Sequence, residues 1–232
     1  MDDGVVGTLY VVATPIGNLA DVSLRALEVL RTVDRIACED TRWTRKLLTH
    51  HGIRTPLTAY HDHNEDRAAR SIVERLRSGE NVALVTDSGT PLISDPGFRL
   101  VRLAVEENVS VVPVPGPSAV AAALSAAGVP PHPFLFAGFL PRKSGARRRR
   151  AEGLGDVPAT LVFYESPHRV ASSLRDLSEV LGEREAAVCR EMTKIHEEFL
   201  RGTLVELADE AERRSFKGEI VIVVGPPPKE DR

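Results

Sequence analysis

The sequence is poor in aromatic residues and in cysteine. Phe, Trp and Tyr make up 5% of its 232 residues, so a buried core must be built mainly from Val, Leu, Ala and Ile, as is common in α/β proteins. Its two cysteines, Cys38 and Cys189, lie in apolar, strand-like runs, which favours buried thiols over a disulfide scaffold. The length suffices for one large domain or two small ones.

Long hydrophobic runs and a strong charge excess are also missing. No apolar stretch approaches the roughly 20 residues needed to span a bilayer. The sequence opens MDDGVVGTLYVVA, with acids where a secretory signal carries Lys or Arg. We therefore expect a cytoplasmic protein without a membrane partner. The formal net charge is −3, so any contact with nucleic acid must come from a local basic patch.

The signatures of several enzyme classes are absent. There is no CxxC or HExxH zinc spacing, no GxxxxGK[ST] or GxGxxG phosphate loop, and no GxSxG nucleophile elbow. His61 and His63 alternate in YHDHNE as a metal pair would. No further metal-binding cluster accompanies them, so a polar loop or a substrate contact is favoured, and we expect no metal.

Apolar runs alternate with segments of helical period, which predicts an α/β fold. Strands are expected at residues 9–13, 34–38, 57–60, 82–86 and 109–114, and later at 134–139, 160–164, 186–192, 196–201 and 219–224. Helices are expected at 41–50, 64–79, 118–127 and 167–181. Another helix should begin after its cap Ser23 and carry Leu24, Leu27 and Leu30 on one face, and a short amphipathic helix should precede the last strand. The first half predicts a mostly parallel sheet. Consecutive strands in the second half predict a mixed sheet, and we place the domains at 1–116 and 117–232.

Three Gly/Pro-rich loops follow strands of the first half: TPIGN, DSGTPLISDPG and PGPSA. Ligands of parallel sheets bind beyond the carboxyl ends of the strands. Gly lets the backbone approach a ligand closely, and Pro stiffens the loop. The loops therefore indicate a site for a polar, nucleoside-like ligand, although each alone would be an ordinary turn.

Eight segments together resemble the ribosomal RNA small subunit methyltransferase I family, a branch of the tetrapyrrole methylases. They are LYVVATPIGNLADVSLRALEVL, CEDTR, AYHDHNE, ALVTDSGTPLISDPG, VVPVPGPSA, GFLPRK, VFYESPHR and GEIVIVV. The resemblance implies a class III methyltransferase with two α/β domains and S-adenosylmethionine bound in the cleft between them. It also implies a homodimer that 2′-O-methylates a cytidine ribose in the decoding region of 16S ribosomal RNA, within the small ribosomal subunit.

The same resemblance implies which residues bind the methyl donor. The SGDP loop of the wider group falls on residues 88–91, where Thr90 replaces its aspartate and Asp87 precedes the loop. We therefore expect this loop to contact the methyl donor through its backbone, as in the wider group, rather than through the missing aspartate side chain. The expected donor-binding residues are Pro15, Gly17, Asp87, Gly89, Thr90, Pro91, Ile93, Gly116, Ser118 and Ala119, with Tyr164, Arg190, Gly218 and Ile220 from the second domain.

A ribose 2′-hydroxyl is a weak nucleophile at neutral pH, so the reaction needs a proton acceptor. Glu165 follows a strand and precedes His168 and Arg169 at a helix start, and Glu39 and Asp40 follow another strand. We expect these five residues to be catalytic. The structural alternatives are a Glu165–Arg169 pair and a capped helix start with a surface ion pair.

A basic run after GFLP is the local patch that the net charge conceals. Lys and Arg bind nucleic acids through their phosphates, although charge runs are usually solvated helix faces. The expected RNA contacts are Arg142, Lys143, Arg147, Arg148, Arg149 and Arg150 of this run, with Arg42, His61 and His63. Two other functions stay open: a methylase of tetrapyrroles or corrinoids, and a non-catalytic RNA-binding module.

Overall fold

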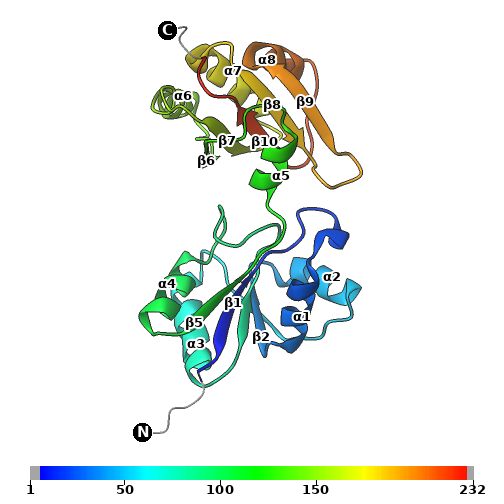
Figure 1. Cartoon of the computed structure of the whole chain (residues 1–232), viewed down its shortest axis with the longest axis vertical. Helices are drawn as coiled ribbons and strands as arrows, with labels where there is room; N and C mark the ends of the chain where they lie inside the picture. The colour runs from blue at the N-terminus through cyan, green and yellow to red at the C-terminus, as the bar shows by residue number, and fades with distance from the viewer. Residues whose placement is uncertain (1–5, 229–232) are drawn as a thin grey trace. The chain divides into compact units, whose positions relative to one another are not determined.

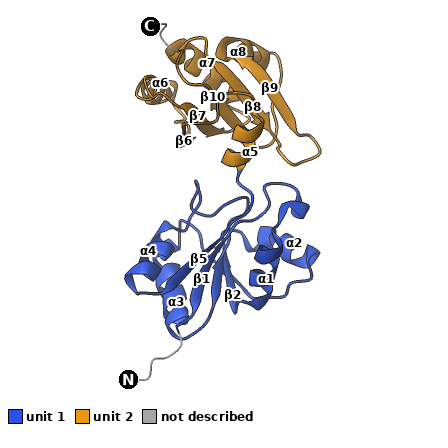
Figure 2. Ribbon diagram, viewed as in Figure 1, with its two compact units in different colours: residues 1–118 blue, residues 119–232 orange. Residues whose placement is uncertain are grey.

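The computed structural model describes residues 6–228 and divides into two compact units, 1–118 and 119–232 (Figure 2). The division falls two residues after the boundary expected from the sequence. Each unit contains one five-stranded sheet with its own hydrophobic core.

The sheet of unit 1 is parallel throughout and has the strand order β3-β2-β4-β1-β5. Its strands are β1 (Thr8–Val12), β2 (Arg35–Cys38), β3 (Leu57–Ala59), β4 (Val82–Leu84) and β5 (Ser110–Val114). Its helices are η1 (Leu19–Asp21), α1 (Leu24–Thr32), α2 (Thr41–His50), α3 (Glu65–Arg77) and α4 (Phe98–Glu106). One core cluster joins the sheet to α3 and α4 and another joins it to α1 and α2, so helices cover both faces (Figure 1). Parallel sheets are buried in this way because crossover helices cover them.

One local prediction in unit 1 was wrong. Ser23 does cap α1, since its hydroxyl accepts from Ala26 N at 3.1 Å, but Leu24 is 86% exposed. The buried stripe is formed by Ala26, Leu27 and Leu30, and Leu24 lies roughly a third of a turn away from it. Asn64 is the N-cap residue of α3, but its side chain makes no capping hydrogen bond, because its oxygen accepts from His61 N at 2.9 Å.

The sheet of unit 2 is mixed, as predicted, with the order β6-β7-β10-β8-β9. Its strands are β6 (Phe134–Phe139), β7 (Thr160–Glu165), β8 (Glu185–Arg190), β9 (Glu198–Thr203) and β10 (Ile220–Val224). β6 and β7 are parallel, and the remaining pairs are antiparallel. Its helices are α5 (Ala119–Ala126), α6 (Ser144–Glu152), α7 (Val170–Leu181) and α8 (Leu204–Glu212). The core lies between the sheet and α6, α7 and α8, while α5 packs on β10 (Figure 1).

Both cysteines are free and buried, as the sequence predicts. Burial raises the pKa of Cys38 to about 11 and the pKa of Cys189 to about 12. The thiolate is the reactive form, so both thiols should resist alkylation at pH 8 in the folded protein. Timed labelling with iodoacetamide, followed by mass spectrometry, should show modification only after denaturant is added. Rapid labelling of either thiol in the native protein would contradict this.

Within residues 6–228, no helix is long and apolar enough to cross a membrane.

Candidate active site

Three loops meet at the carboxyl edge of the sheet of unit 1. Thr14 N donates to Gly89 O at 2.8 Å and Gly89 N donates to Thr14 O at 3.1 Å, which ties the loop after β1 to the loop after β4. The Thr90 hydroxyl donates to Pro117 O at 3.0 Å, which ties the latter loop to the segment after β5. The three Gly/Pro-rich segments therefore form one interlocked assembly.

This assembly depends on backbone that favours glycine. Gly89 has φ +87°, and a Cβ there would lie 3.4 Å from Ile16 Cγ2. A Cβ at Gly116 would lie 3.1 Å from the Cβ of Ala13. Leu92 and Ser94 are also left-handed, with φ 72° and 67°. Such strain in non-glycine residues clusters at functional sites, so the loop after β4 has the character of a binding loop.

The expected donor-binding residues of unit 1 all lie on these loops or directly after them. Pro15, Gly89 and Pro91 are buried within the assembly, whereas Gly17, Gly116 and Ile93 are exposed. Thr90 and Ser118 are half-buried, and the next residue, Ala119, begins α5 of unit 2.

A group of carboxylates lies at the same edge. Glu39 follows β2, Asp62 follows β3, and Asp87 and Asp95 belong to the loop after β4. Partial burial raises the pKa of Glu39, and the carboxylates of Asp87, Asp95 and Asp62 raise it further. Burial also raises the pKa values of Asp87 and Asp95. These groups hold their protons more readily than ordinary carboxyls, which suits a proton acceptor.

Two hydrogen bonds to the start of α2 fix Asp87 within this group. Its Oδ1 accepts from Asp40 N at 3.1 Å, and its carbonyl oxygen accepts from Trp43 Nε1 at 2.8 Å. The start of α2 and the loop after β4 are thereby joined. Sequence reasoning missed Asp95 and Trp43. The DPG turn and the single tryptophan beside CEDTR were the available signals.

Asp40 has a structural role at the start of α2, and its catalytic role stays a prediction. Asp40 caps α2 through Arg42 N at 2.8 Å, and its other oxygen pairs with the Arg42 guanidinium at 2.8 Å. Hydrogen bonding to Arg42 lowers the pKa of Asp40 to about 2, so this carboxylate is a poor proton acceptor. The cap and the surface ion pair that the structural alternative describes are both present.

Glu165 is bonded to its neighbours inside unit 2, and its catalytic role stays a prediction. Its side chain is fully buried, at 0% exposure, and its Oε1 pairs with Arg169 Nη2 at 2.7 Å and accepts from Ser166 N at 2.7 Å. The Ser173 hydroxyl donates to Oε2. With both oxygens occupied inside unit 2, Glu165 and Arg169 hold the turn between β7 and α7. His168 is exposed on that turn.

His61 and His63 lie next to each other after β3, with ring centroids 6.0 Å apart. Among the residues that the structure describes, no group of three or more His, Cys, Asp or Glu is arranged to hold a metal ion.

The expected donor-binding residues of unit 2 lie along adjacent strands. Ile220 is in register with both Glu165 and Arg190, and its buried side chain belongs to the core of unit 2. Arg190 donates to Lys217 O at 2.7 Å and pairs with Glu198 at 3.4 Å. Gly218 has φ +86°, and the Glu191 side chain occupies the space that a Cβ would need. The Tyr164 ring contacts those of Phe136 and Phe139, with centroids 4.8 and 5.5 Å away.

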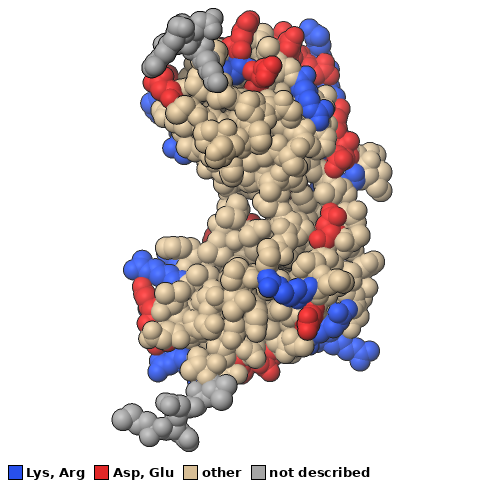
Figure 3. Space-filling view, viewed as in Figure 1, with Lys and Arg blue, Asp and Glu red and all other residues tan. Residues whose placement is uncertain are grey.

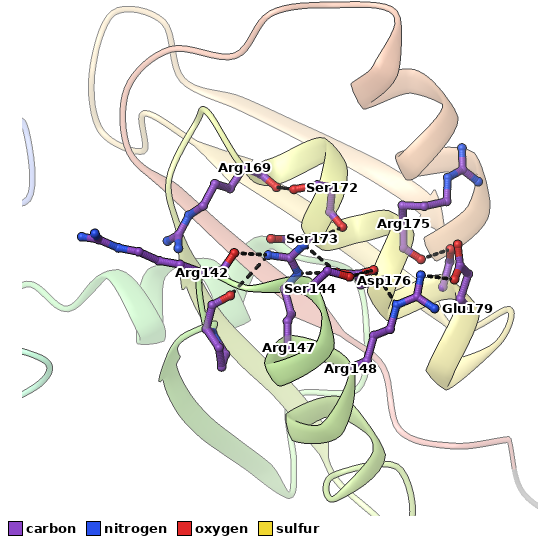
Figure 4. Close-up of polar contacts among 12 residues, drawn as sticks. Arg142, Ser144, Arg147, Arg148, Arg169, Ser172, Ser173, Arg175, Asp176 and Glu179 are labelled. Atoms are coloured by element: carbon purple, nitrogen blue, oxygen red, sulfur yellow. Dashed lines mark hydrogen bonds and ion pairs between the residues drawn. The ribbon is translucent and has the colours of Figure 1, made fainter.

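Most of the basic run lies on α6, which begins after Arg142 and Lys143. Arg147 is buried there and is not an RNA contact. Arg147 is 3% exposed, and its Nε donates to Asp176 on α7 at 2.7 Å, as Figure 4 shows. Ser144 Oγ and Arg148 Nε donate to the other Asp176 oxygen at 2.9 and 2.8 Å. Because α6 buries only Arg147 and Ala151, this carboxylate fastens the helix to α7.

The other cations of the run remain available to a ligand. Arg142, Lys143, Arg149 and Arg150 are exposed, while Arg148 is half-buried and pairs with Asp176 and Glu179. On the face shown in Figure 3, cations and acids are interspersed. Any contact with RNA on that face must therefore be confined to a few neighbouring cations.

Comparisons with known proteins agree with this fold. The family Tetrapyrrole (Corrin/Porphyrin) Methylases matches residues 8–208. Ribosomal RNA small subunit methyltransferase I of Mesorhizobium japonicum is 57% identical over 94% of this chain and 75% of its own length. The protein of the same name from Bacillus subtilis is 47% identical over 94% and 75%.

Two solved structures share the fold at low identity. Cobalt precorrin-4 methyltransferase, a cobalamin biosynthetic enzyme, has a TM-score of 0.71 and 18% identity, with 94% of each chain covered. Uroporphyrin-III C-methyl transferase from Thermus thermophilus, complexed with S-adenyl homocysteine, has a TM-score of 0.67 and 20% identity over 94% of this chain and 97% of its own. The predicted tetrapyrrole-methylase-like α/β fold is thus confirmed, and the chain belongs to the ribosomal RNA small subunit methyltransferase I family of the tetrapyrrole methylases.

Proposed function

We propose that this protein transfers a methyl group from S-adenosylmethionine to the 2′-oxygen of a cytidine ribose in the decoding region of 16S ribosomal RNA. The observation that carries the proposal is the interlocked loop assembly beside carboxylates of raised pKa, at one edge of the sheet of unit 1. The names of the relatives, which are ribosomal RNA methyltransferases, support RNA as the substrate class.

The loop assembly fits a nucleoside-like donor. Gly89 and Gly116 remove side chains where the loops approach each other, and the neighbouring prolines stiffen the backbone that would contact the donor. The negative charge of Asp87 complements a cationic sulfonium. When bound, the donor supplies a methyl group on a positively charged sulfur, which is its own leaving group and needs no metal.

The chain's own residues must orient the ribose and accept the hydroxyl proton. Glu39 is the best candidate, because burial and the neighbouring carboxylates raise its pKa above that of an ordinary carboxyl. Asp87 is tied to Asp40 N and so positions the start of α2 against the donor loop. The proposal also includes a homodimer that acts on the small ribosomal subunit in the cytoplasm.

The exposed cations of α6 would hold the RNA backbone. Replacing both Arg149 and Arg150 with Ala should weaken RNA binding, and the slope of log affinity against log salt should fall by about 1.4 for two lost phosphate contacts to a single strand. Fluorescence anisotropy of labelled RNA across a salt series measures this slope. The matched control replaces two exposed arginines elsewhere, Arg70 on α3 and Arg213 directly after α8, with Ala. Equal salt slopes for both double variants and the wild type would show that Arg149 and Arg150 of α6 do not bind RNA phosphates.

A labelled-methyl assay tests the substrate class. The protein is mixed with S-adenosylmethionine carrying a radioactive methyl group and with small ribosomal subunits, free 16S RNA or uroporphyrinogen III. We expect label in RNA. Label in the tetrapyrrole alone would assign the chain to small-molecule methylation, and no transfer to any acceptor would favour a non-catalytic RNA-binding module.

A further inference from the structure

Trp43, the single tryptophan of the chain, is half exposed although it is the largest apolar side chain available for burial. It lies on α2, whose inward face is formed by Thr44, Leu47 and Leu48. The indole is therefore not used in the core, and 52% of the residue remains exposed. An exposed aromatic ring in a fixed position is a common feature of sites that bind planar ligands.

Two contacts fix the ring in place. Trp43 Nε1 donates to the carbonyl oxygen of Asp87 at 2.8 Å. Lys46, one turn further along α2, places its ammonium 4.2 Å from the ring centroid, which is a cation–π contact. The ring is thus held before any ligand arrives, which lowers the entropic cost of binding.

The surroundings of the ring indicate the charge of its ligand. The outward face of α2 carries the exposed cations Arg45 and Lys46, beside Arg42, which pairs with Asp40, and the helix itself contains no carboxylate. A polyanionic backbone complements these cations, whereas the cationic sulfonium of a methyl donor does not. The adjoining residue Asp87 contributes its carbonyl to Trp43 and its carboxylate to the group that includes Glu39.

We propose that Trp43 is a stacking platform for a nucleobase of the RNA substrate, with Arg45 and Lys46 binding the adjoining phosphates. This inference rests on the proposed function and adds the surface that aligns the RNA strand beside the carboxylates. The ligand class is a single-stranded RNA segment, because base pairs within a duplex do not expose a face for stacking.

The single tryptophan makes the test direct. A 12-nucleotide single-stranded RNA should quench and shift Trp43 emission, whereas an abasic ribose-phosphate chain of the same length should not. Replacing Trp43 with Ala should weaken binding of labelled RNA about tenfold, and Trp43→Phe should lose less, since stacking on one aromatic ring contributes about 5- to 150-fold per base. Arg45→Ala should reduce the salt slope by about 0.7 and leave the quenching at saturation unchanged.

Three results would overturn the platform. Equal quenching by the abasic chain would show that phosphates alone are bound. Quenching by S-adenosylhomocysteine, with weaker binding of that compound to the Ala variant, would assign the ring to the donor's adenine. A change in molecular mass on light scattering for the Ala variant, at unchanged RNA affinity, would assign the ring to a second copy of the chain.

The platform and the proposed function fail in distinguishable ways. If the wild-type protein binds and methylates RNA without any change in Trp43 emission, the platform is wrong and the function stands. If it neither binds nor methylates RNA, the function itself is wrong. Circular dichroism of the Ala and Phe variants shows whether each is folded. A folded variant that binds RNA more weakly has lost stacking and not its fold.

Discussion

Replacing Glu39 with Gln is expected to slow methyl transfer to RNA by on the order of 10²- to 10⁴-fold, the usual contribution of a general base. The amide matches the carboxylate in shape but cannot accept the hydroxyl proton. Donor and RNA affinities should change little, because the loops after β1, β4 and β5 are fixed by contacts that do not involve the Glu39 side chain. Single-turnover rates with saturating donor measure the effect.

The pH profile and a matched variant sharpen this test. A base works when deprotonated, so the rate should rise with pH through the raised pKa of Glu39, above the ordinary carboxyl value of about 4.3. Glu28→Gln is the control, since Glu28 is also exposed in unit 1 but lies on α1. If Glu39→Gln retains the wild-type rate, Glu39 is not the base, and Asp87→Asn and Asp95→Asn become the next variants to measure.

Replacing Asp176 with Asn is expected to lower the free energy of unfolding of unit 2 by about 3–5 kcal/mol, as for other broken buried ion pairs. Arg147 and Asp176 are almost fully buried, with side chains 3% and 6% exposed. Asn cannot neutralise the guanidinium, which would be left charged inside the protein. Denaturant titration followed by circular dichroism measures the loss.

Two further variants separate charge burial from packing. Arg147→Met with Asp176→Leu removes both charges and should recover most of the stability, because well-packed apolar pairs often replace buried ion pairs at no cost. Glu179→Gln, at an exposed partner of Arg148, should change stability by less than about 1 kcal/mol. A loss for Asp176→Asn no larger than that of Glu179→Gln would contradict the assignment.

Acid should weaken this pair in a defined direction. Burial alone would raise the pKa of Asp176, but hydrogen bonds from Ser144, Arg148 and Arg147 outweigh it and hold the pKa below its ordinary value. The stabilisation is therefore complete above the ordinary carboxyl pKa and is lost as the pH falls through the lowered one.

Much of the fold follows from local patterns in the sequence. Helix α2 begins at Thr41 and ends at His50, as predicted, since its apolar spacing and its acidic cap are both local features. Helix α4 was missed, because it follows Gly97, which has no side chain to cap the helix, so no capping signal marks its start. Strand order, by contrast, depends on contacts between distant segments that no local pattern contains.

In the candidate site, too, local features were predictable from the sequence and contacts between distant residues were not. The three loops and Glu39 were predicted, because a residue that directly follows a strand of a parallel sheet must lie at the ligand-binding edge. Arg147 was wrongly assigned because it sits among identical neighbours, and its partner Asp176 is 29 residues away. The sequence offers Glu165 both as a catalytic group and as a partner of Arg169, and it does not reveal that the side chain turns into unit 2.

Mapping of 2′-O-methyl groups on small-subunit RNA tests the central claim most directly. RNA from cells with and without this protein is compared by alkaline hydrolysis and mass spectrometry, with the Glu39→Gln variant supplied as a third sample. We predict one 2′-O-methylcytidine in the decoding region, which is absent from cells without the protein and is restored by the wild-type protein but not by the Glu39→Gln variant. Identical methylation in the presence and absence of the protein would contradict it.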